Sequence, residues 1–459
     1  MTILQKITAI WKEDNLLRRI VRNSSYLFGS NVISSGLGFI QGIIAFRLVG
    51  VTNWGAIALI ITFSSNVNRL LSFRMSEVMV KYFGPALADG KKAEAAALVK
   101  AAGMTEAAVS LIAFLIVILL APWASTVIAK DARTAPWFVF YSLIILFNLV
   151  YETSTGFLQA THRFERMARY TVIQAVITFL VIAGTYILYR WVMTDLLAPY
   201  LVPAVLLAYV LGKAYYNFSQ VTLTLKELSS TLGPGWWRTS LKQLPGKRAR
   251  LAFALNTNLN GTVNLVFRDN IQLYLGYLLS TTEVGYFNLA LGFITTITLI
   301  LDPFIAPTYS EIARTVAKYQ WDTTLRLLRR VTTIASGIVL AVAGFWALTG
   351  WWLIPFVYKP QARPVYPVLL ILLLGYGFAG IFQWNRSLML SLGKAGYPVL
   401  IEVLAGVVEL ALIFSLVPRF GYLMMAAILS GYFILSIGFI ALRGLWEVRH
   451  RRVIATVQP

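Results

Sequence analysis

The stretch IVLAVAGFWALTGWWLIPFV, residues 338–357, contains no charged side chain. A helix needs about 20 apolar residues to cross the hydrocarbon core of a bilayer. Similar runs recur, such as LIAFLIVILLAPW at 111–123, and 58% of the 459 residues are hydrophobic while only 13% are charged. A soluble chain of this length would carry more surface charge. The sequence therefore predicts an all-α, polytopic membrane protein.

We expect about twelve transmembrane helices in two pseudo-symmetric six-helix bundles around a central cavity. Their expected positions are 24–49, 54–81, 99–123, 136–161, 170–192, 197–218, 250–279, 284–312, 327–356, 364–391, 396–417 and 421–443. The expected domains are an amphipathic cytoplasmic leader at 1–23, an N-lobe at 24–218, a basic cytoplasmic linker at 219–249, a C-lobe at 250–443 and a basic tail at 444–459. No cleavable signal peptide is expected, because the first apolar run is long enough to span.

The basic residues are distributed unevenly along this topology. Of the 40 lysines and arginines, 29 fall in segments that are cytoplasmic if the N-terminus is inside, 6 in external loops and 5 inside helices. Such a bias predicts that both termini are cytoplasmic. The net charge of +21 then reflects topology and attraction to anionic phospholipids, not nucleic-acid binding. With no cysteine, disulfides and thiolate metal sites are excluded.

The two halves of the chain resemble one another. Ser76-Glu77 near the end of the second helix matches Ser310-Glu311 near the end of the eighth, and residues 156–180 match residues 388–412. Because six helices form each half, the halves point the same way. This arrangement is typical of transporters that bind their substrate between two parallel repeats.

The stretch ITFSSNVNRLLSFRMSEVMVKYF, residues 61–83, is too polar for lipid contact. On a helix, one face would carry Thr62, Ser65, Asn66, Arg69, Ser72 and Ser76. A charge at the bilayer centre costs at least about 2.5–3.5 kcal/mol, so it faces water or a partner. Arg69 has no acidic residue three or four positions away, which favours a water-filled cavity. Arg74 and Glu77 have the spacing of a structural ion pair.

Further polar residues lie in other expected helices. Asn264, Arg268 and Gln272 share a face of the first helix of the second half, with Asp269 beside it, so each half directs one arginine inward. Asn31 and Arg47 are candidates in the first helix, and Glu152 and Arg386 are candidate cavity residues. Asp302, before Pro303, is a candidate proton or cation site, or the structural partner of an arginine. Glu402 and Glu409 are interpreted as packing or ion-pair residues. No Walker A, GxSxG or HExxH sequence occurs, so no enzymatic activity, metal or other cofactor is expected beyond coupling to H⁺ or Na⁺.

Several segments resemble the Wzx-like polysaccharide transporters, the flippases of O-antigen and other lipid-linked oligosaccharides. These segments are RNSSYLFGSNVISSGLGFIQGIIAFRLVGVTNWG (22–55), RDNIQLYLGYLLSTTEVGYFNLALGF (268–293), LGKAGYPVLIEVL (392–404) and LVPRFGYLMMAAILSGY (416–432). The similarity extends over nearly the whole chain. The superfamily also holds multidrug-and-toxin extruders and lipid II flippases.

This resemblance implies a V-shaped bundle in which helices 1, 2, 7 and 8 line a cavity. It implies that an undecaprenyl-pyrophosphate-linked oligosaccharide is turned from the inner to the outer leaflet by alternating access, with polysaccharide polymerase machinery as a partner of a monomeric flippase. Arginine forks suit a pyrophosphate, and the Asn, Ser, Thr and Gln side chains suit sugars. Two alternatives stay open at this point. A multidrug cation antiporter would favour an acidic cavity, and a receptor or structural membrane protein would leave the polar stripes unexplained.

Overall fold

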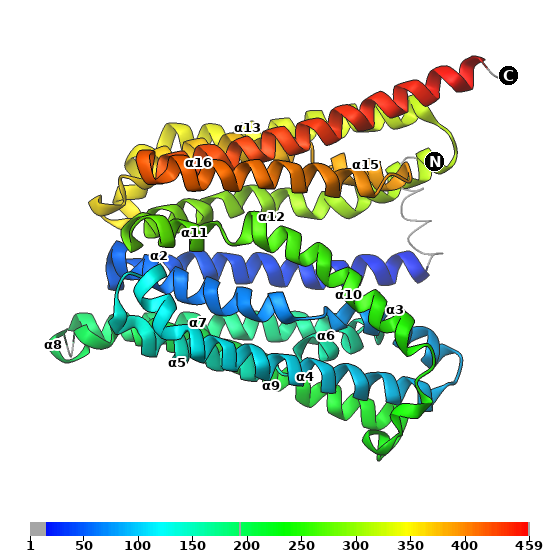
Figure 1. Ribbon diagram of the computed structural model, residues 1–459, viewed down its shortest axis with the longest axis horizontal. Helices are drawn as coiled ribbons and strands as arrows, with labels where there is room; N and C mark the ends of the chain where they lie inside the picture. Colours follow the sequence, from blue (N-terminus) through cyan, green and yellow to red (C-terminus); the bar gives the residue numbers. More distant parts are fainter. Residues whose placement is uncertain (1–14, 192–193, 458–459) are drawn as a thin grey trace. The chain divides into compact units, whose positions relative to one another are not determined.

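The computed structural model describes residues 15–191 and 194–457 (Figure 1). Its helices are α2 (Asn15–Leu71), α3 (Met75–Ala88), α4 (Lys92–Trp123), α5 (Ala135–Phe147), α6 (Tyr151–Ala160), α7 (Phe164–Trp191), α8 (Thr194–Leu197), α9 (Leu201–Leu232), α10 (Lys247–Asn264), α11 (Ile271–Leu278), α12 (Thr281–Ala317), α13 (Trp321–Tyr358), α14 (Val365–Ile381), α15 (Asn385–Ser391) and α16 (Gly396–Val457). No strand occurs within these described ranges. The prediction of an all-α fold is confirmed. Most of the predicted leader, residues 1–14, lies outside the described residues.

Nine helical stretches of the described chain are long and apolar enough to cross a membrane. Two of them, Ser25–Leu71 and Gly396–Ile454, have 47 and 59 residues, about two to three times the length that one crossing needs. Each contains a glycine with positive φ, Gly50 or Gly421, where the helix is broken. The protein is therefore a multi-pass membrane protein, and its spans are compatible with the twelve predicted helices.

Contacts within the chain divide it into two units. Unit 1 comprises the described residues of Met1–Leu48, Phe63–Ala124 and Arg133–Thr262, and unit 2 comprises Val49–Thr62, Ser125–Ala132 and the described residues of Val263–Pro459. The units overlap largely with the predicted lobes at 24–218 and 250–443. They differ from these lobes in residues 49–62 and 125–132, which group with unit 2, and in residues 219–262, which group with unit 1 although the linker and the start of the C-lobe are predicted there.

Two helices predicted to be continuous are interrupted at matching places. The predicted helix 136–161 is split into α5 and α6, and the predicted helix 364–391 is split into α14 and α15. Glu152 is the second residue of α6 and Arg386 is the second residue of α15, so the two charged residues occupy equivalent positions after a break. Polar groups freed by a break in a membrane helix must find other partners, which sequence periodicity does not reveal.

Two further predicted helices are also interrupted. The first interruption shows that the predicted polar face from Thr62 to Ser76 is not continuous. Helix 54–81 stops at Leu71, and α3 starts at Met75 after Arg74, which has a left-handed conformation with φ 45°. Ser72 and Ser76 therefore do not continue the helical face of Arg69. Helix 250–279 contains a π-helical turn at Leu265–Asp269, and Arg268 lies in that turn. Such turns are frequent at functional sites because they redirect side chains.

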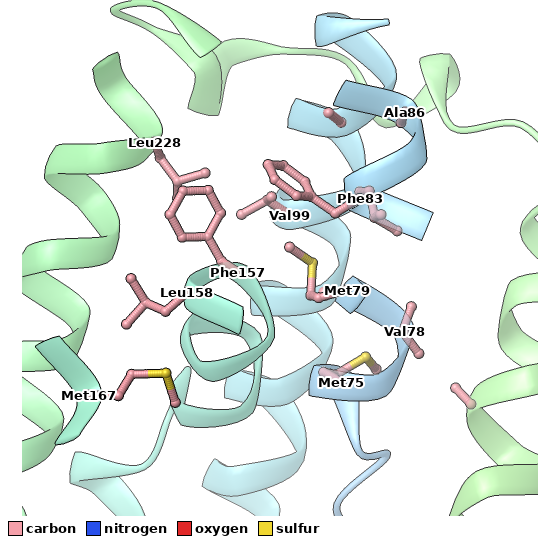
Figure 2. Close-up of a cluster of buried hydrophobic side chains, with 14 residues drawn as sticks. Met75, Val78, Met79, Phe83, Ala86, Val99, Phe157, Leu158, Met167 and Leu228 are labelled. Carbon is pink, nitrogen blue, oxygen red and sulfur yellow. The ribbon is translucent and has the colours of Figure 1, made fainter. Parts of the chain in front are cut away.

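A hydrophobic cluster joins α3, α4, α6 and α9 within unit 1 (Figure 2). Phe157 of α6 and Phe83 of α3 are fully buried, with ring centroids 5.2 Å apart. Figure 2 shows Leu228 of α9 and Met79 of α3 on either side of this ring pair. Next to the cluster, a Cβ on Gly156 would lie 2.7 Å from the backbone oxygen of Ser76, so α3 and α6 meet backbone to backbone. This packing fixes the position of α3 relative to α6, and both helices contribute residues to one polar pocket.

Candidate functional site

Unit 1 contains a polar pocket of about 410 Å³. Its lining comes from the end of α2, the 72–74 break, α3, α4, α5, α6, α9 and α10. The charged lining residues are Arg69, Arg74, Glu77, Glu106, Glu152 and Lys213, and the uncharged polar ones include Ser64, Ser65, Asn68, Ser72, Ser76, Ser110, Asn148 and Asn258. Six charged residues around one pocket are incompatible with contact to lipid, so this space is a candidate site for a hydrated or charged ligand.

Two of the carboxylates lie at helix N-termini. Glu106 of α4 is buried, and it accepts backbone N–H groups of Glu152 at 2.6 Å and Thr153 at 2.8 Å, in the first turn of α6. It also accepts the Thr153 hydroxyl at 2.7 Å. Glu152 in turn accepts the hydroxyl and the backbone N–H of Ser76, in the first turn of α3. Each helix N-terminus carries about half a positive charge, which offsets part of each carboxylate charge.

The third carboxylate pairs with an arginine of the break. Arg74 Nη1 donates to Glu77 Oε1 at 3.1 Å, so the two predicted partners form an ion pair in the first turn of α3. A Cβ on Gly261 would lie 3.2 Å from the Arg74 guanidinium, so the absence of a side chain in α10 leaves room for Arg74.

Lys213 supplies a cation from α9. Among the described residues, no carboxylate lies within ion-pair distance of its ammonium, and the contact that the structure shows is the Tyr216 ring, 5.7 Å from Nζ to the centroid. A Cβ on the neighbouring Gly212 would lie 2.2 Å from Thr178 Oγ1 of α7. Close packing of α9 on α7 at this glycine fixes the position of Lys213 at the pocket.

The break between α5 and α6 is stabilised by amides of α9. Asn217 donates to the Asn148 side chain, and Gln220 donates to the Tyr151 backbone oxygen at 3.4 Å and to Thr155 Oγ1 at 2.6 Å. Both amides are at most 2% exposed. They provide partners for polar groups at a place where the regular helical bonds end.

The pocket therefore has a positive balance, although its formal charges are three positive and three negative. The three carboxylates are bound by helix N-termini or by Arg74, and the two N-termini together add about one positive charge. Lys213 and the exposed Arg69 are two of the three cations in this count. Such an arrangement can bind an anion through charge-assisted hydrogen bonds.

The other predicted residues of unit 1 do not line this pocket. Asn31 is exposed, Arg47 is half-buried and Asn66 is buried with 7% of its surface exposed. None of the three contributes to the pocket lining.

The remaining predicted residues lie in unit 2 and do not line this pocket. The Arg268 guanidinium lies 5.2 Å from the ring centroid of Phe433 and interacts electrostatically with Glu402 and Glu409. Arg386 is a further charged neighbour of Glu402. Gln272 accepts a hydrogen bond from Thr62 at 2.9 Å. Asn264 and Asp269 are half-buried, and Asp302 on α12 is exposed.

Sequence reasoning missed Glu106 and Lys213 as site residues. Glu106 lies in the middle of the apolar run of α4, and a carboxylate in such a run is itself a signal of function. Lys213 counts among the cytoplasmic charges in the predicted topology because it follows the apolar part of its helix. Its helix continues to Leu232, which places Lys213 well inside it.

Known proteins that are similar to this chain are membrane proteins and transporters. The sequence profile of the family described as polysaccharide biosynthesis protein matches residues 20–313. The inner membrane protein YghQ of Escherichia coli (strain K12) is 22% identical over 302 residues, which cover 62% of this chain and 77% of that protein.

Two solved structures show the fold. An inward-facing multidrug resistance MATE family transporter of the MOP superfamily superimposes with a TM-score of 0.68 at 12% identity, covering 91% of this chain and 95% of that one. The lipid II flippase MurJ in an inward closed conformation gives a TM-score of 0.68 at 13% identity, covering 94% and 93%. The family profile matches more than half of the chain, and the fold is that of these transporters. The chain therefore belongs to the polysaccharide biosynthesis protein family.

Proposed function

We propose that this protein is a flippase that turns an undecaprenyl-pyrophosphate-linked oligosaccharide from the inner to the outer leaflet of a bacterial cytoplasmic membrane. The observation that carries the proposal is the pocket of unit 1, in which Lys213 and Arg69 line a space whose carboxylates are already bound by other groups. A pyrophosphate matches these cations, and the surrounding serines and asparagines match sugar hydroxyls. The lipid tail of such a substrate stays in the bilayer while its head crosses.

Family and fold support this proposal. The family is one of polysaccharide biosynthesis, and one solved structure of the same fold is a flippase of lipid II. We further propose that both termini are cytoplasmic, that the two lobes alternate access, that Arg268 of the C-lobe contributes to the same substrate, and that an ion gradient drives the cycle.

A series of charge substitutions tests the proposal. Arg69→Ala or Arg268→Ala should reduce export of the lipid-linked glycan in a deletion strain while the protein remains inserted and folded. Lysine at either position should restore part of the activity, because it keeps the charge but loses the two-pronged geometry. Glutamate should be worse than alanine, because it repels the phosphates across a medium of low dielectric constant. Full export with glutamate at both positions would contradict an anionic substrate.

A multidrug cation antiporter is the second candidate function. The observation in its favour is that three carboxylates, Glu77, Glu106 and Glu152, line the same pocket. This candidate predicts the opposite response: Glu152→Gln would abolish transport of an organic cation, and Arg69→Glu would leave it intact or increase it. Transport of both substrate classes by reconstituted protein separates the two functions.

A further inference from the structure

The last turns of α16 carry an excess of positive charge around one carboxylate. Glu447 has 9% of its side chain exposed and pairs with Lys394 at 2.8 Å, Arg451 at 3.3 Å and Arg443 at 3.6 Å. One negative charge against three positive ones leaves a net charge of about +2 at this cluster. The cations are each one-third or more exposed, so the cluster is open to a further anion.

The three cations differ in how much of their bonding capacity is used. Arg451 donates to Glu447 and also to the backbone oxygen of Leu392 at 3.3 Å, so it holds the end of α15 against α16. Lys394 has three N–H donors and Arg443 has five, and the structure shows each pairing with Glu447 alone among the described carboxylates. These two side chains therefore have donors left for an external acceptor.

An apolar stripe leads to this cluster along one face of α16. Leu435, Phe439, Leu442 and Trp446 are spaced three or four residues apart and are each at least half exposed. α16 belongs to a stretch that is long and apolar enough to cross a membrane, and an exposed apolar face on such a helix is suited to contact acyl chains. Its last member, Trp446, has the Arg443 guanidinium 4.3 Å from its ring centroid and His450 stacked at 5.1 Å. Tryptophan beside arginine at the end of an apolar stripe is the pattern of a membrane interface.

We propose that the C-terminal end of α16 is a binding site for one anionic phospholipid. Its phosphate is held by Lys394 and Arg443, its glycerol region lies on Trp446, and its acyl chain lies along Leu442, Phe439 and Leu435. Three features together select this ligand: a net positive cluster, an indole beside it and an apolar stripe aligned with both. A soluble anion would use only the cluster, and a zwitterionic lipid would gain little from the excess charge. The site shares no residue with the pocket of unit 1, and the proposal does not depend on the transported substrate.

Native mass spectrometry of the full-length protein in detergent tests the proposal. Phosphatidylglycerol and phosphatidylcholine with identical acyl chains are titrated onto the wild type, onto Lys394→Gln/Arg443→Gln, and onto the matched control Arg329→Gln/Arg330→Gln. Each basic residue near an anionic headgroup contributes about 1 kcal/mol, so the first pair should weaken phosphatidylglycerol binding about 30-fold. The control pair removes the same charge from exposed positions of α13 and should weaken it less than about threefold.

Three outcomes would overturn the proposal. Equal weakening by both pairs would mean that general charge attraction suffices. Equal affinity of the wild type for the two lipids would mean that the stripe binds acyl chains without the cluster. Displacement of phosphatidylglycerol by millimolar inorganic phosphate would mean that the cluster binds a free anion. Lys394→Arg/Arg443→Lys keeps both charges and should retain binding, which separates loss of the site from loss of folding.

Discussion

Glu106 of α4 accepts the backbone N–H of Glu152 at 2.6 Å, and Glu152 accepts the backbone N–H of Ser76 at 3.4 Å. The Glu106 carboxylate thus binds the N-terminus of α6, and the Glu152 carboxylate binds the N-terminus of α3. The N-termini of two helices are thus each stabilised by an acid from a neighbouring helix. Both carboxylates therefore bind backbone groups of the pocket wall. The Lys213 ammonium has no described carboxylate within ion-pair distance and can bind the anionic group of a ligand.

Removing the first carboxylate should destabilise unit 1. Glu106→Ala leaves two N–H groups and one hydroxyl of α6 without their acceptor, and the Thr153 groups among them are buried. A lost partner of a buried polar group costs about 1–3 kcal/mol, so the variant should unfold at a clearly lower temperature in detergent. Glu106→Gln keeps one acceptor oxygen and should lose less than half as much stability. An unchanged unfolding temperature for the alanine variant would mean that water replaces the carboxylate.

Close packing in unit 2 gives a second prediction. A Cβ on Gly55 would lie 1.7 Å from the Thr281 backbone oxygen, and one on Gly285 would lie 2.3 Å from the Val51 oxygen. Small residues allow membrane helices to approach at the backbone. Gly55→Ala must therefore separate the 49–62 segment from α12, and it should lower both the unfolding temperature and transport.

Gly84 provides the control for this change. It lies in α3, and a Cβ added there would have no atom within 4 Å. Gly84→Ala should stabilise slightly, by about 1 kcal/mol or less, through helix propensity. Equal unfolding temperatures for Gly55→Ala and Gly84→Ala would contradict the close approach.

The fold could be predicted from hydropathy, because soluble proteins seldom contain repeated charge-free apolar runs of about 20 residues. The breaks could not be predicted in the same way. The break before α6 depends on Asn217 and Gln220, which lie about 70 residues away in the sequence and satisfy its polar groups. The site was predicted in part: Arg69, Arg74, Glu77 and Glu152 do line one pocket. Glu106 and Lys213 were missed, since their roles depend on which helix ends and which glycines lie beside them.

The unequal distribution of basic residues predicts the topology. Reporter fusions after Lys92, Lys242 and Arg449 should report cytoplasmic positions, and a fusion after Arg133 should report an external one, because positively charged loops remain inside. An external signal from the 219–249 loop would contradict a division into two parallel halves of six helices.

Asp302 gives the prediction on coupling. It is exposed on α12 and directly precedes Pro303, which interrupts the helical hydrogen bonding. Asp302→Asn should slow flipping in proteoliposomes and weaken its response to an imposed pH or sodium gradient, since an amide does not exchange a proton or hold a cation as a carboxylate does. Glu311→Gln is the control on the same helix, because Glu311 is exposed and pairs locally with Arg314. Unchanged gradient dependence in Asp302→Asn would assign Asp302 to packing.

Lys213 provides the sharpest test of the pocket, because it lines the pocket and no described carboxylate lies within ion-pair distance of its ammonium. A charge-assisted hydrogen bond contributes about 1.5–3 kcal/mol, so Lys213→Ala should weaken substrate binding about 10- to 150-fold and reduce flipping accordingly. Lys213→Arg should retain part of the activity, and Lys213→Glu should be worse than alanine because it repels the phosphates. Lys226→Ala is the matched control, since Lys226 lies on the same helix, is exposed and does not line the pocket. Each variant is measured for flipping of a lipid-linked oligosaccharide in proteoliposomes, with its unfolding temperature recorded. If Lys213→Ala and Lys226→Ala flip at the same rate, the anion is bound elsewhere and the pocket of unit 1 has a structural role.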